Sequence, residues 1–337
     1  MRNKRTREEY GGFLPLELNP GKEWFDPYKD NLRRFNSVKA ALVHMINSID
    51  IQEIYIPYYY CPSTTEAIRK TGIKVKFYHI DHLLHPIDLP DTAGTAVLIV
   101  NYFGLLDSYV AEKAKEITSA SVFVDNAHAF FCKPVMRQNI YNFYSAKKFI
   151  GVPDGAYLIG EDIPAYNGEC EYAADYSHFL LLAYEQGTNA AYDEKKETDL
   201  FIGSHYGAMS KLARGILQNA DYLRVIENRR DNYGAFQNTL QKRNLLRIKE
   251  SVPAYLFPFL TKNGNKIKKA LVKEKIFVPT LWAGENLLAN GNEFELMMSS
   301  DAVFLPVDQR YDLEDILFMA DVVEELCDEN TNIGHNN

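Results

Sequence analysis

The stretch from residue 121 to residue 160 of this 337-residue chain brings together side chains that could do chemistry. Asp125 follows an unbroken apolar run, His128 comes shortly after it, and Ser145 precedes a pair of lysines that ends at Lys148. Such an apolar run predicts a strand buried on both faces, and open α/β sheets bind ligands at the carboxyl ends of their strands. We therefore expect these side chains to meet at one mouth of one sheet.

A lysine amine and a carboxylate in this arrangement suit pyridoxal 5'-phosphate (PLP). A lysine amine forms a Schiff base with an aldehyde, and PLP is held in this way. An Asp beside the pyridine nitrogen favours its protonated form, which makes the ring an electron sink. We predict PLP as the cofactor, with Lys148 holding it, Asp125 beside its ring nitrogen and the hydroxyl of Ser145 at its phosphate. The alternative for Asp125 is a cap on a following helix.

Two adjacent lysines compete for the cofactor. Adjacent side chains of an extended chain point to opposite sides, so only one of Lys147 and Lys148 can face the ring. The spacing from Ser145 and the step to Asp154 both select Lys148.

The stretch resembles the DegT/StrS family of PLP-dependent sugar aminotransferases. The family's pattern is Asp-x-x-His/Gln at a strand end, then a Ser and the Schiff-base Lys, then an acidic residue and Gly. The matching residues here are Asp125 and His128, Ser145 and Lys148, and Asp154 with Gly155. The resemblance covers most of the chain: residues 35–42 resemble the phosphate-binding helix start, residues 55–81 the next strand-helix-strand unit, and residues 228–233 the connecting helix.

The resemblance implies an α/β fold of the aspartate-aminotransferase-like kind (PLP fold type I). We expect a large PLP-binding domain with a mostly parallel sheet and an N-terminal wrapping segment over residues 1–235, a small C-terminal α/β domain over 236–330, and a tail over 331–337. The implied activity moves an amino group from L-glutamate to a keto-sugar nucleotide, for amino-sugar or surface-polysaccharide biosynthesis. Lys148 counts against the family's dehydratase branch, where a His replaces it. The resemblance also implies a homodimer with active sites at the interface.

Further binding residues are expected around this centre. A helix is predicted to begin at Val38 after the cap residue Ser37, and its free N–H groups suit either a simple cap or an anion. With Ser145 nearby we favour the phosphate. The full set of expected cofactor-binding residues is Asp125, His128, Ser145, Ser37, Val38, Lys39, Tyr59 and Tyr60, and the expected substrate residues are Asn101 and Tyr102. For the tyrosines, core packing and an aromatic face for the cofactor ring are both open.

The chain departs from the family's pattern in two places. Cys61 stands where the family usually has a ring-stacking Phe or Trp, so a neighbouring Tyr or His128 takes that role, or nothing does. Tyr206 and Ala208 stand where the family commonly has an Asn and an Arg that reach the partner subunit's cofactor phosphate. These differences leave two alternatives open: a catalytically impaired or regulatory DegT-like protein, and a PLP enzyme of another reaction type.

The predicted elements place the residues as follows. Strands and helices that alternate between residues 51 and 124 specify a mostly parallel sheet. The predicted strands are 13–18 as an edge strand, 51–57, 73–79, 95–100, 121–124, 140–144, 155–160, 254–260, 277–282 and 302–307, and the predicted helices are 38–46, 63–70, 107–120, 172–186, 209–218, 221–240, 265–271 and 313–326. Residues 187–199 are expected to be mobile and residues 328–337 disordered.

Composition limits the partners. The net charge of −8 argues against a nucleic-acid groove. Four scattered cysteines without a CxxC pair indicate reduced thiols and a cytoplasmic protein. The chain shows no secretory signal and no apolar run long enough for a membrane span. His79, His82 and His85 lack Cys or acidic partners, so no metal is expected.

The turn after Lys148 is apolar over residues 149–153. An exposed apolar loop suggests an interface between two copies of the chain, and burial beneath the N-terminal segment is the alternative.

Overall fold

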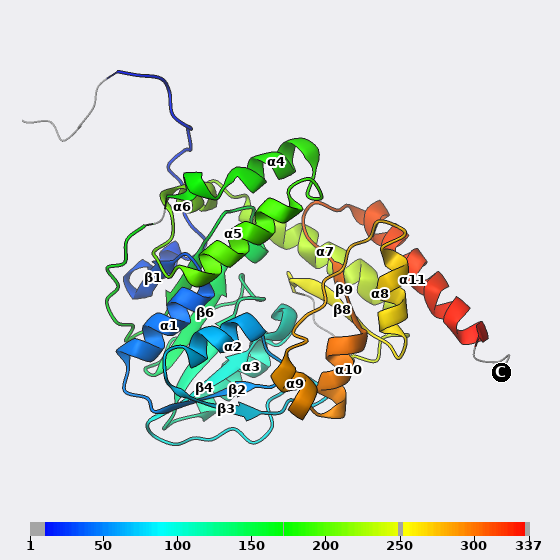
Figure 1. The fold of residues 1–337 in the computed structure, drawn as a ribbon, viewed down its shortest axis with the longest axis horizontal. Helices are drawn as coiled ribbons and strands as arrows, with labels where there is room; N and C mark the ends of the chain where they lie inside the picture. The colour runs from blue at the N-terminus through cyan, green and yellow to red at the C-terminus, as the bar shows by residue number, and fades with distance from the viewer. Residues whose placement is uncertain (1–10, 171, 249–251, 334–337) are drawn as a thin grey trace, which may run out of the picture.

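The computed structural model describes residues 11–170, 172–248 and 252–333. Its main layer is a seven-stranded sheet with the order β1-β7-β6-β5-β4-β2-β3 (Figure 1). The strands are β1 (Leu32–Phe35), β2 (Glu53–Pro57), β3 (Lys74–Tyr78), β4 (Thr95–Val100), β5 (Ser121–Asn126), β6 (Ile140–Ser145) and β7 (Ala156–Ile159). The five strands from β3 to β6 in this order are parallel, while β7 is antiparallel to β6 and β1 is antiparallel to β7.

Helices cover this sheet. Strand β4 is buried along its whole length, as expected for an apolar run that has helices on both faces. Helices α1 (Val38–Ser48) and α2 (Pro62–Arg69) pack on each other, α1 also packs on β1, β6 and β7, and α3 (Asp107–Glu116) packs on β4 and β5. Short 3-10 turns are η1 (Asp26–Asn31), η2 (Tyr102–Gly104), η3 (Ala146–Lys148) and η4 (Ala173–Asp175).

A second layer follows in the C-terminal part. Strands β8 (Leu256–Leu260) and β9 (Ala302–Pro306) form an antiparallel pair. Helix α8 (Gly264–Leu271) packs on β9 and on α11 (Leu313–Ile333), and α7 (Tyr222–Leu240) packs on β8 and on α11. Figure 1 shows α7 running alongside the β8–β9 pair, near α8. The remaining helices are α4 (His178–Gln186), α5 (Tyr192–Ser204), α6 (Lys211–Gln218), α9 (Glu285–Asn290) and α10 (Glu293–Asp301). The boundaries expected between two domains stay a prediction.

Several expected elements are wrong. Residues 13–18 form no strand, and residues 277–282 form none either, because Pro279 lacks an N–H and the chain turns there with Trp282 at a positive φ of 64°. Strand β1 was not predicted, since its two arginines mask a four-residue strand whose ends alone are buried. The segment expected to be mobile contains most of α5, and residues 328–333 of the expected disordered tail belong to α11; the rest of that tail lies outside the described residues.

The apolar turn after Lys148 is not exposed, so the argument that it marks an interface is wrong. Phe149, Ile150 and Val152 are buried in a cluster that includes Phe25 of the N-terminal segment and Met209. The alternative of burial within the chain is therefore the correct one. Within the described ranges, no helix combines the length and the apolar character needed to cross a membrane.

Candidate functional site

A cavity of about 700 Å³ opens at the carboxyl edge of the parallel strands. Val100, Asp125 and Ser145 line it from the ends of β4, β5 and β6, and Tyr60 lines it from just beyond β2. The register places Val100 directly beside Asp125 in neighbouring strands. Side chains far apart in the sequence thus meet where a parallel sheet is expected to bind its ligand.

Lys148 reaches this cavity from η3, the turn that follows β6. Its Nζ lies 5.3 Å from the centroid of the Tyr255 ring. Burial lowers the pKa of the Lys148 amine, although the charges of Asp125 and Cys61 act in the opposite direction. A lowered pKa leaves more of the amine in its neutral form, which is the form that attacks an aldehyde.

Asp125 is held by two hydrogen bonds. The Tyr60 hydroxyl donates to its Oδ2 at 2.6 Å, and the backbone N–H of Ala127 donates to its Oδ1 at 2.8 Å. No helix follows β5 directly, because residues 127–139 form turns, so the helix-cap alternative for Asp125 is wrong. The carboxylate is buried at the cavity wall with its orientation defined by both oxygens.

His128 lies between aromatic rings. Its imidazole is 4.5 Å from the Tyr255 ring centroid and 5.2 Å from that of Trp282, nearly parallel to the latter at 8°. Burial, and then the charge of Lys148, lower the pKa of His128 well below its ordinary value, so the ring is neutral at neutral pH. Its buried Nδ1 has no hydrogen-bond partner among the described residues. His128 therefore contributes a neutral ring to the cavity wall, while its Nδ1 atom is buried.

The start of α1 forms the second polar wall. The Ser37 hydroxyl caps α1 by accepting from the N–H of Ala40, and Ser37, Val38 and Lys39 all line the cavity. The N–H groups of Val38 and Lys39, in the first turn, have no partner within the helix. Burial lowers the pKa of the Lys39 amine, which lies against Gly203 of α5. With Ser145 nearby, this wall offers hydroxyls, amide N–H groups and a cation, the donor set that a phosphate requires.

Three expected residues are placed elsewhere. Tyr59, Asn101 and Tyr102 are buried and are not among the residues that line the cavity. The Tyr102 hydroxyl donates to the Tyr59 carbonyl at 2.7 Å. The Asn101 amide donates to Asp107 at 2.7 Å and its Oδ1 accepts from the N–H of Leu106, so Asn101 supports the start of α3.

Two parts of the cavity wall were missed in the sequence. Helix α5 contributes Lys195 and Asp199, and Asp199 pairs with Lys147 at 2.8 Å. Thr198 and Ile202, the buried residues of α5, lie one helical turn apart, and this spacing was the sequence pattern that could have predicted a helix in this polar segment. Trp282 also lines the cavity, as does Cys61, and no local pattern around Trp282 indicates this.

No protein-family model matches the chain, and no curated protein matches it. Among solved structures, that of DesI in the presence of its TDP-sugar product covers 93% of this chain and 86% of its own, with a TM-score of 0.64 and 17% identity. A DegT DnrJ EryC1 StrS aminotransferase from Brucella abortus covers 88% of this chain and 85% of its own, with a TM-score of 0.61 and 14% identity.

A third similar structure is that of a dehydratase. The E. coli GDP-4-keto-6-deoxy-D-mannose-3-dehydratase with bound hydrated PLP covers 90% of this chain and 92% of its own, with a TM-score of 0.61 and 18% identity. These similarities confirm the predicted α/β fold of the aspartate-aminotransferase-like kind, PLP fold type I. At these identities the likeness establishes the fold, and the reaction has to be argued from the side chains of the cavity.

Proposed function

We propose that the chain is a PLP-dependent aminotransferase that moves an amino group to a keto-sugar carried by a nucleotide. The observation that carries the proposal is the Lys148 amine, whose pKa is lowered by burial, in the same cavity wall as the buried carboxylate of Asp125. The fold is shared with an aminotransferase and with a dehydratase that binds PLP. The lysine favours the aminotransferases, because the resemblance implies a His at this position in the dehydratases.

The residues present suit PLP at both ends of the cofactor. Asp125 would face the pyridine nitrogen, and the neutral ring of His128 would lie against the cofactor. Ser145, Ser37, the first N–H groups of α1 and Lys39 would hold the phosphate. Lys39 would supply a positive charge from the same chain, whereas the family commonly takes this charge from the partner subunit. Bound PLP would supply an electron sink for the electron pair left when a proton is removed from the amino donor.

Lys148 has two tasks in this proposal. Its Nζ would hold the cofactor through the cofactor's aldehyde, and once freed it would accept a proton from the donor's α-carbon and return it at another carbon. A lysine of ordinary pKa would be protonated at neutral pH and would do neither. The Tyr255 ring lies against the amine, and the stacked rings of His128 and Trp282 add apolar surface to the same part of the site.

The decisive experiment separates cofactor binding from turnover. The protein is incubated with PLP, reduced with borohydride and mapped by mass spectrometry, and we expect the label on Lys148. The unreduced complex is then mixed with L-glutamate, and we expect about one equivalent of 2-oxoglutarate per chain. No label on Lys148 would end the PLP proposal. A label without 2-oxoglutarate would favour the impaired or regulatory alternative, or another amino donor, which a panel of amino acids identifies.

The acceptor is tested directly. With the donor established, a panel of nucleotide-linked keto-sugars should give an aminated product, which places the enzyme in amino-sugar or surface-polysaccharide biosynthesis. The four cysteines are free, which supports a reducing, cytoplasmic location. A donor half-reaction without amination of any keto-sugar nucleotide would limit the proposal to the transaminase class.

We also propose a homodimer. Large apolar side chains are exposed on α4 and α5, including Leu181, Tyr184 at 91% and Leu200, and an exposed apolar surface of this kind favours contact with another chain. Because α5 forms part of the cavity wall, a partner packed on α4 and α5 would lie beside the site. Light scattering should give about twice the 38.6 kDa chain mass. A monomer that binds PLP at full occupancy would contradict the proposal that two chains share the site.

A further inference from the structure

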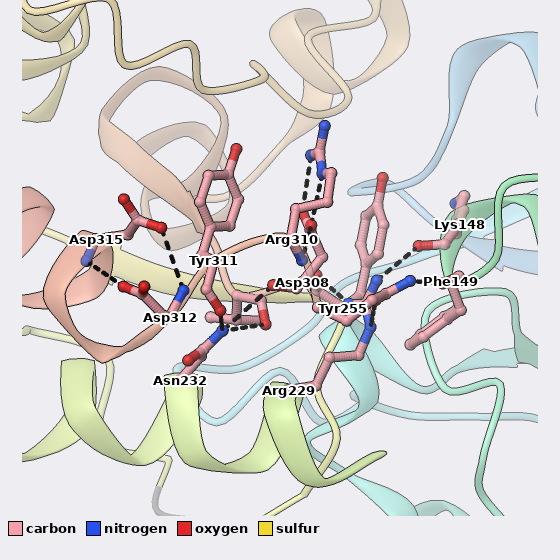
Figure 2. A network of polar contacts seen from close by, with 12 residues as sticks. Lys148, Phe149, Arg229, Asn232, Tyr255, Asp308, Arg310, Tyr311, Asp312 and Asp315 are labelled. Atoms are coloured by element: carbon pink, nitrogen blue, oxygen red, sulfur yellow. Dashed lines mark hydrogen bonds and ion pairs between the residues drawn. The ribbon is translucent and has the colours of Figure 1, made fainter. Parts of the chain in front are cut away.

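A buried arginine and a glutamine hold the backbone of the turn that carries Lys148. Arg229 of α7 donates from Nη2 to the carbonyl oxygen of Lys148 at 3.3 Å (Figure 2). Gln309 donates from Nε2 to the next carbonyl, that of Phe149, at 2.8 Å. Arg229 Nε in turn donates to Gln309 Oε1 at 3.2 Å. Two consecutive carbonyls are therefore bound by two side chains that also bind each other.

The same arginine fixes the ring that flanks the lysine amine. Its Nη1 donates to the carbonyl oxygens of Ala254 and Tyr255 at 3.0 and 3.2 Å. The Tyr255 ring lies against Lys148 Nζ and against His128. Figure 2 shows the guanidinium between the Tyr255 backbone and the Lys148 turn. Both the backbone of Lys148 and one wall of its amine thus depend on the position of a single side chain.

The chemistry of this contact is unusual for a residue that only joins two layers. Arg229 is 2% exposed, and each of these four acceptors is a neutral oxygen. Burial lowers the pKa of Arg229 to about 10, so it is still charged at neutral pH, and its guanidinium lies 4.6 Å from the Phe149 ring centroid. A buried charge is costly unless its donors are satisfied, and the planar guanidinium fork holds several acceptors in one rigid geometry.

The turn itself needs such a contact. Lys148 ends a 3-10 turn of only three residues, and the chain leaves the helical conformation at Phe149. The carbonyls at the end of so short a turn have no partner within it, and a side chain that binds them determines how the turn is oriented.

We propose that Arg229, with Gln309, is a positioning residue that orients the Lys148 turn and the Tyr255 ring so that the amine is kept in the water-poor part of the cavity. The inference rests on the proposed function for its consequence, but the geometry it predicts exists in the protein without cofactor. The groups whose charges or rings face the amine are Asp125 of β5, Cys61 before α2, Lys147 beside it, Asp199 of α5, His128 and Tyr255. Replacing Arg229 should change the positions of the amine and of the Tyr255 ring relative to the other groups.

The test measures Lys148 in the cofactor-free protein. Competitive acetylation over a range of pH, followed by peptide mapping, gives the pKa of individual lysine amines. In Arg229→Ala, water reaches the amine, so its pKa should rise toward the ordinary lysine value by about one unit, which lowers the neutral fraction near pH 7.5 about tenfold. Gln309→Ala should shift it in the same direction by a smaller amount.

The matched control is Asn232→Ala, because Asn232 lies on the same helix and binds the same C-terminal segment. Its side chain donates to the carbonyls of Val307, Asp308 and Tyr311, and Figure 2 shows it beside Arg229 but without a contact to Lys148. Asn232→Ala should lower the stability of the fold without changing the pKa of the Lys148 amine. The inference would be overturned if Asn232→Ala shifted the pKa of the Lys148 amine as much as Arg229→Ala does, or if Arg229→Ala left that pKa unchanged.

Two further outcomes are separated. If Arg229→Ala does not fold, the pKa of the Lys148 amine is compared between Gln309→Ala and Asn232→Ala. An unchanged pKa in Gln309→Ala then overturns the inference. If the wild-type protein takes up no borohydride-reducible PLP, the proposed function fails, while the acetylation result still confirms or overturns the positioning role of Arg229.

Discussion

At the residue scale, Lys147 and Lys148 show how adjacent identical side chains acquire different chemistry. Lys147 Nζ pairs with Asp199 at 2.8 Å, whereas Lys148 Nζ lies over the Tyr255 ring and has its pKa lowered by burial. A paired ammonium is a poor nucleophile, and a buried amine is a good one.

The first prediction follows from this difference. Lys148→Ala should abolish the covalent attachment of PLP, while Lys147→Ala, as its matched control, should retain it. Borohydride reduction and intact mass measure both. Attachment in Lys148→Ala, or its loss only in Lys147→Ala, would reverse the assignment of the two lysines.

The second prediction concerns Asp125. Asp125→Ala should leave PLP attached but slow proton removal from the donor by roughly 10²-fold or more, because the negative charge beside the ring nitrogen is lost. Tyr60→Phe removes the 2.6 Å hydrogen bond to Asp125 while keeping the carboxylate, and should have a much smaller effect. Single-turnover rates with L-glutamate measure this. Nearly normal rates in Asp125→Ala would return Asp125 to the capping of its turn.

At the scale of elements, α5 is the part of the cavity wall that a polar, partly exposed helix supplies. Its buried residues are Thr198 and Ile202, and Thr198 donates to the carbonyl of Tyr176 at 3.0 Å. The ion pair of Lys147 with Asp199 joins α5 to the Lys148 turn, and Lys195 pairs with the same carboxylate within α5. Although burial opposes it, these two cations lower the pKa of Asp199, so its carboxylate is charged at neutral pH.

The third prediction is therefore that Asp199→Ala loosens α5. Partly exposed ion pairs contribute about 0.5 to 1 kcal/mol, so amide exchange over residues 192–204 should rise about two- to fivefold. Lys196→Ala is the control, because Lys196 lies on the same helix and lines the cavity. Hydrogen-exchange mass spectrometry checks both variants, and equal exchange in the two would show that the Asp199 pairs do not hold α5.

At the scale of the whole molecule, Glu23 attaches the N-terminal segment to the sheet. Its Oε2 accepts from Arg34 Nε of β1 at 2.8 Å and from the Tyr157 hydroxyl of β7 at 2.9 Å, and its Oε1 accepts from Arg214 Nε of α6 at 2.8 Å. Burial alone would raise the pKa of Glu23, but these donors lower it overall. One carboxylate thus joins four separate segments.

The fourth prediction concerns acid stability. Because the folded pKa of Glu23 lies below its unfolded value near 4.5, its contribution is complete above that pH and is lost as pH falls through the folded value. Glu23→Gln should lower the free energy of unfolding by about 2 kcal/mol at pH 7, and the difference should shrink in acid. Urea unfolding at pH 7 and below pH 4 measures it; a difference that does not depend on pH would contradict the charged role of Glu23.

The sequence by itself determined six of the seven strands of the sheet, all but β1, and the chemical groups at its edge. The apolar runs of β4 and β5, and the position of Asp125 and Ser145 directly at strand ends, are local patterns, and the carboxyl ends of parallel strands meet in any fold of this class. The choice of Lys148 over Lys147 also came from local spacing, and it stays a prediction that the mapped label will test.

Only the tertiary structure decided what surrounds these groups. Trp282 and α5 reach the cavity, and Tyr255 reaches the Lys148 amine, from segments more than 40 residues away from Lys148, and a contact of that kind leaves no periodic signal in the chain. Burial of residues 149–153 likewise depends on where Phe25 and α7 pack, which an apolar pattern cannot distinguish from an exposed interface. Local patterns specify which face of an element is apolar, and long-range packing decides what covers it.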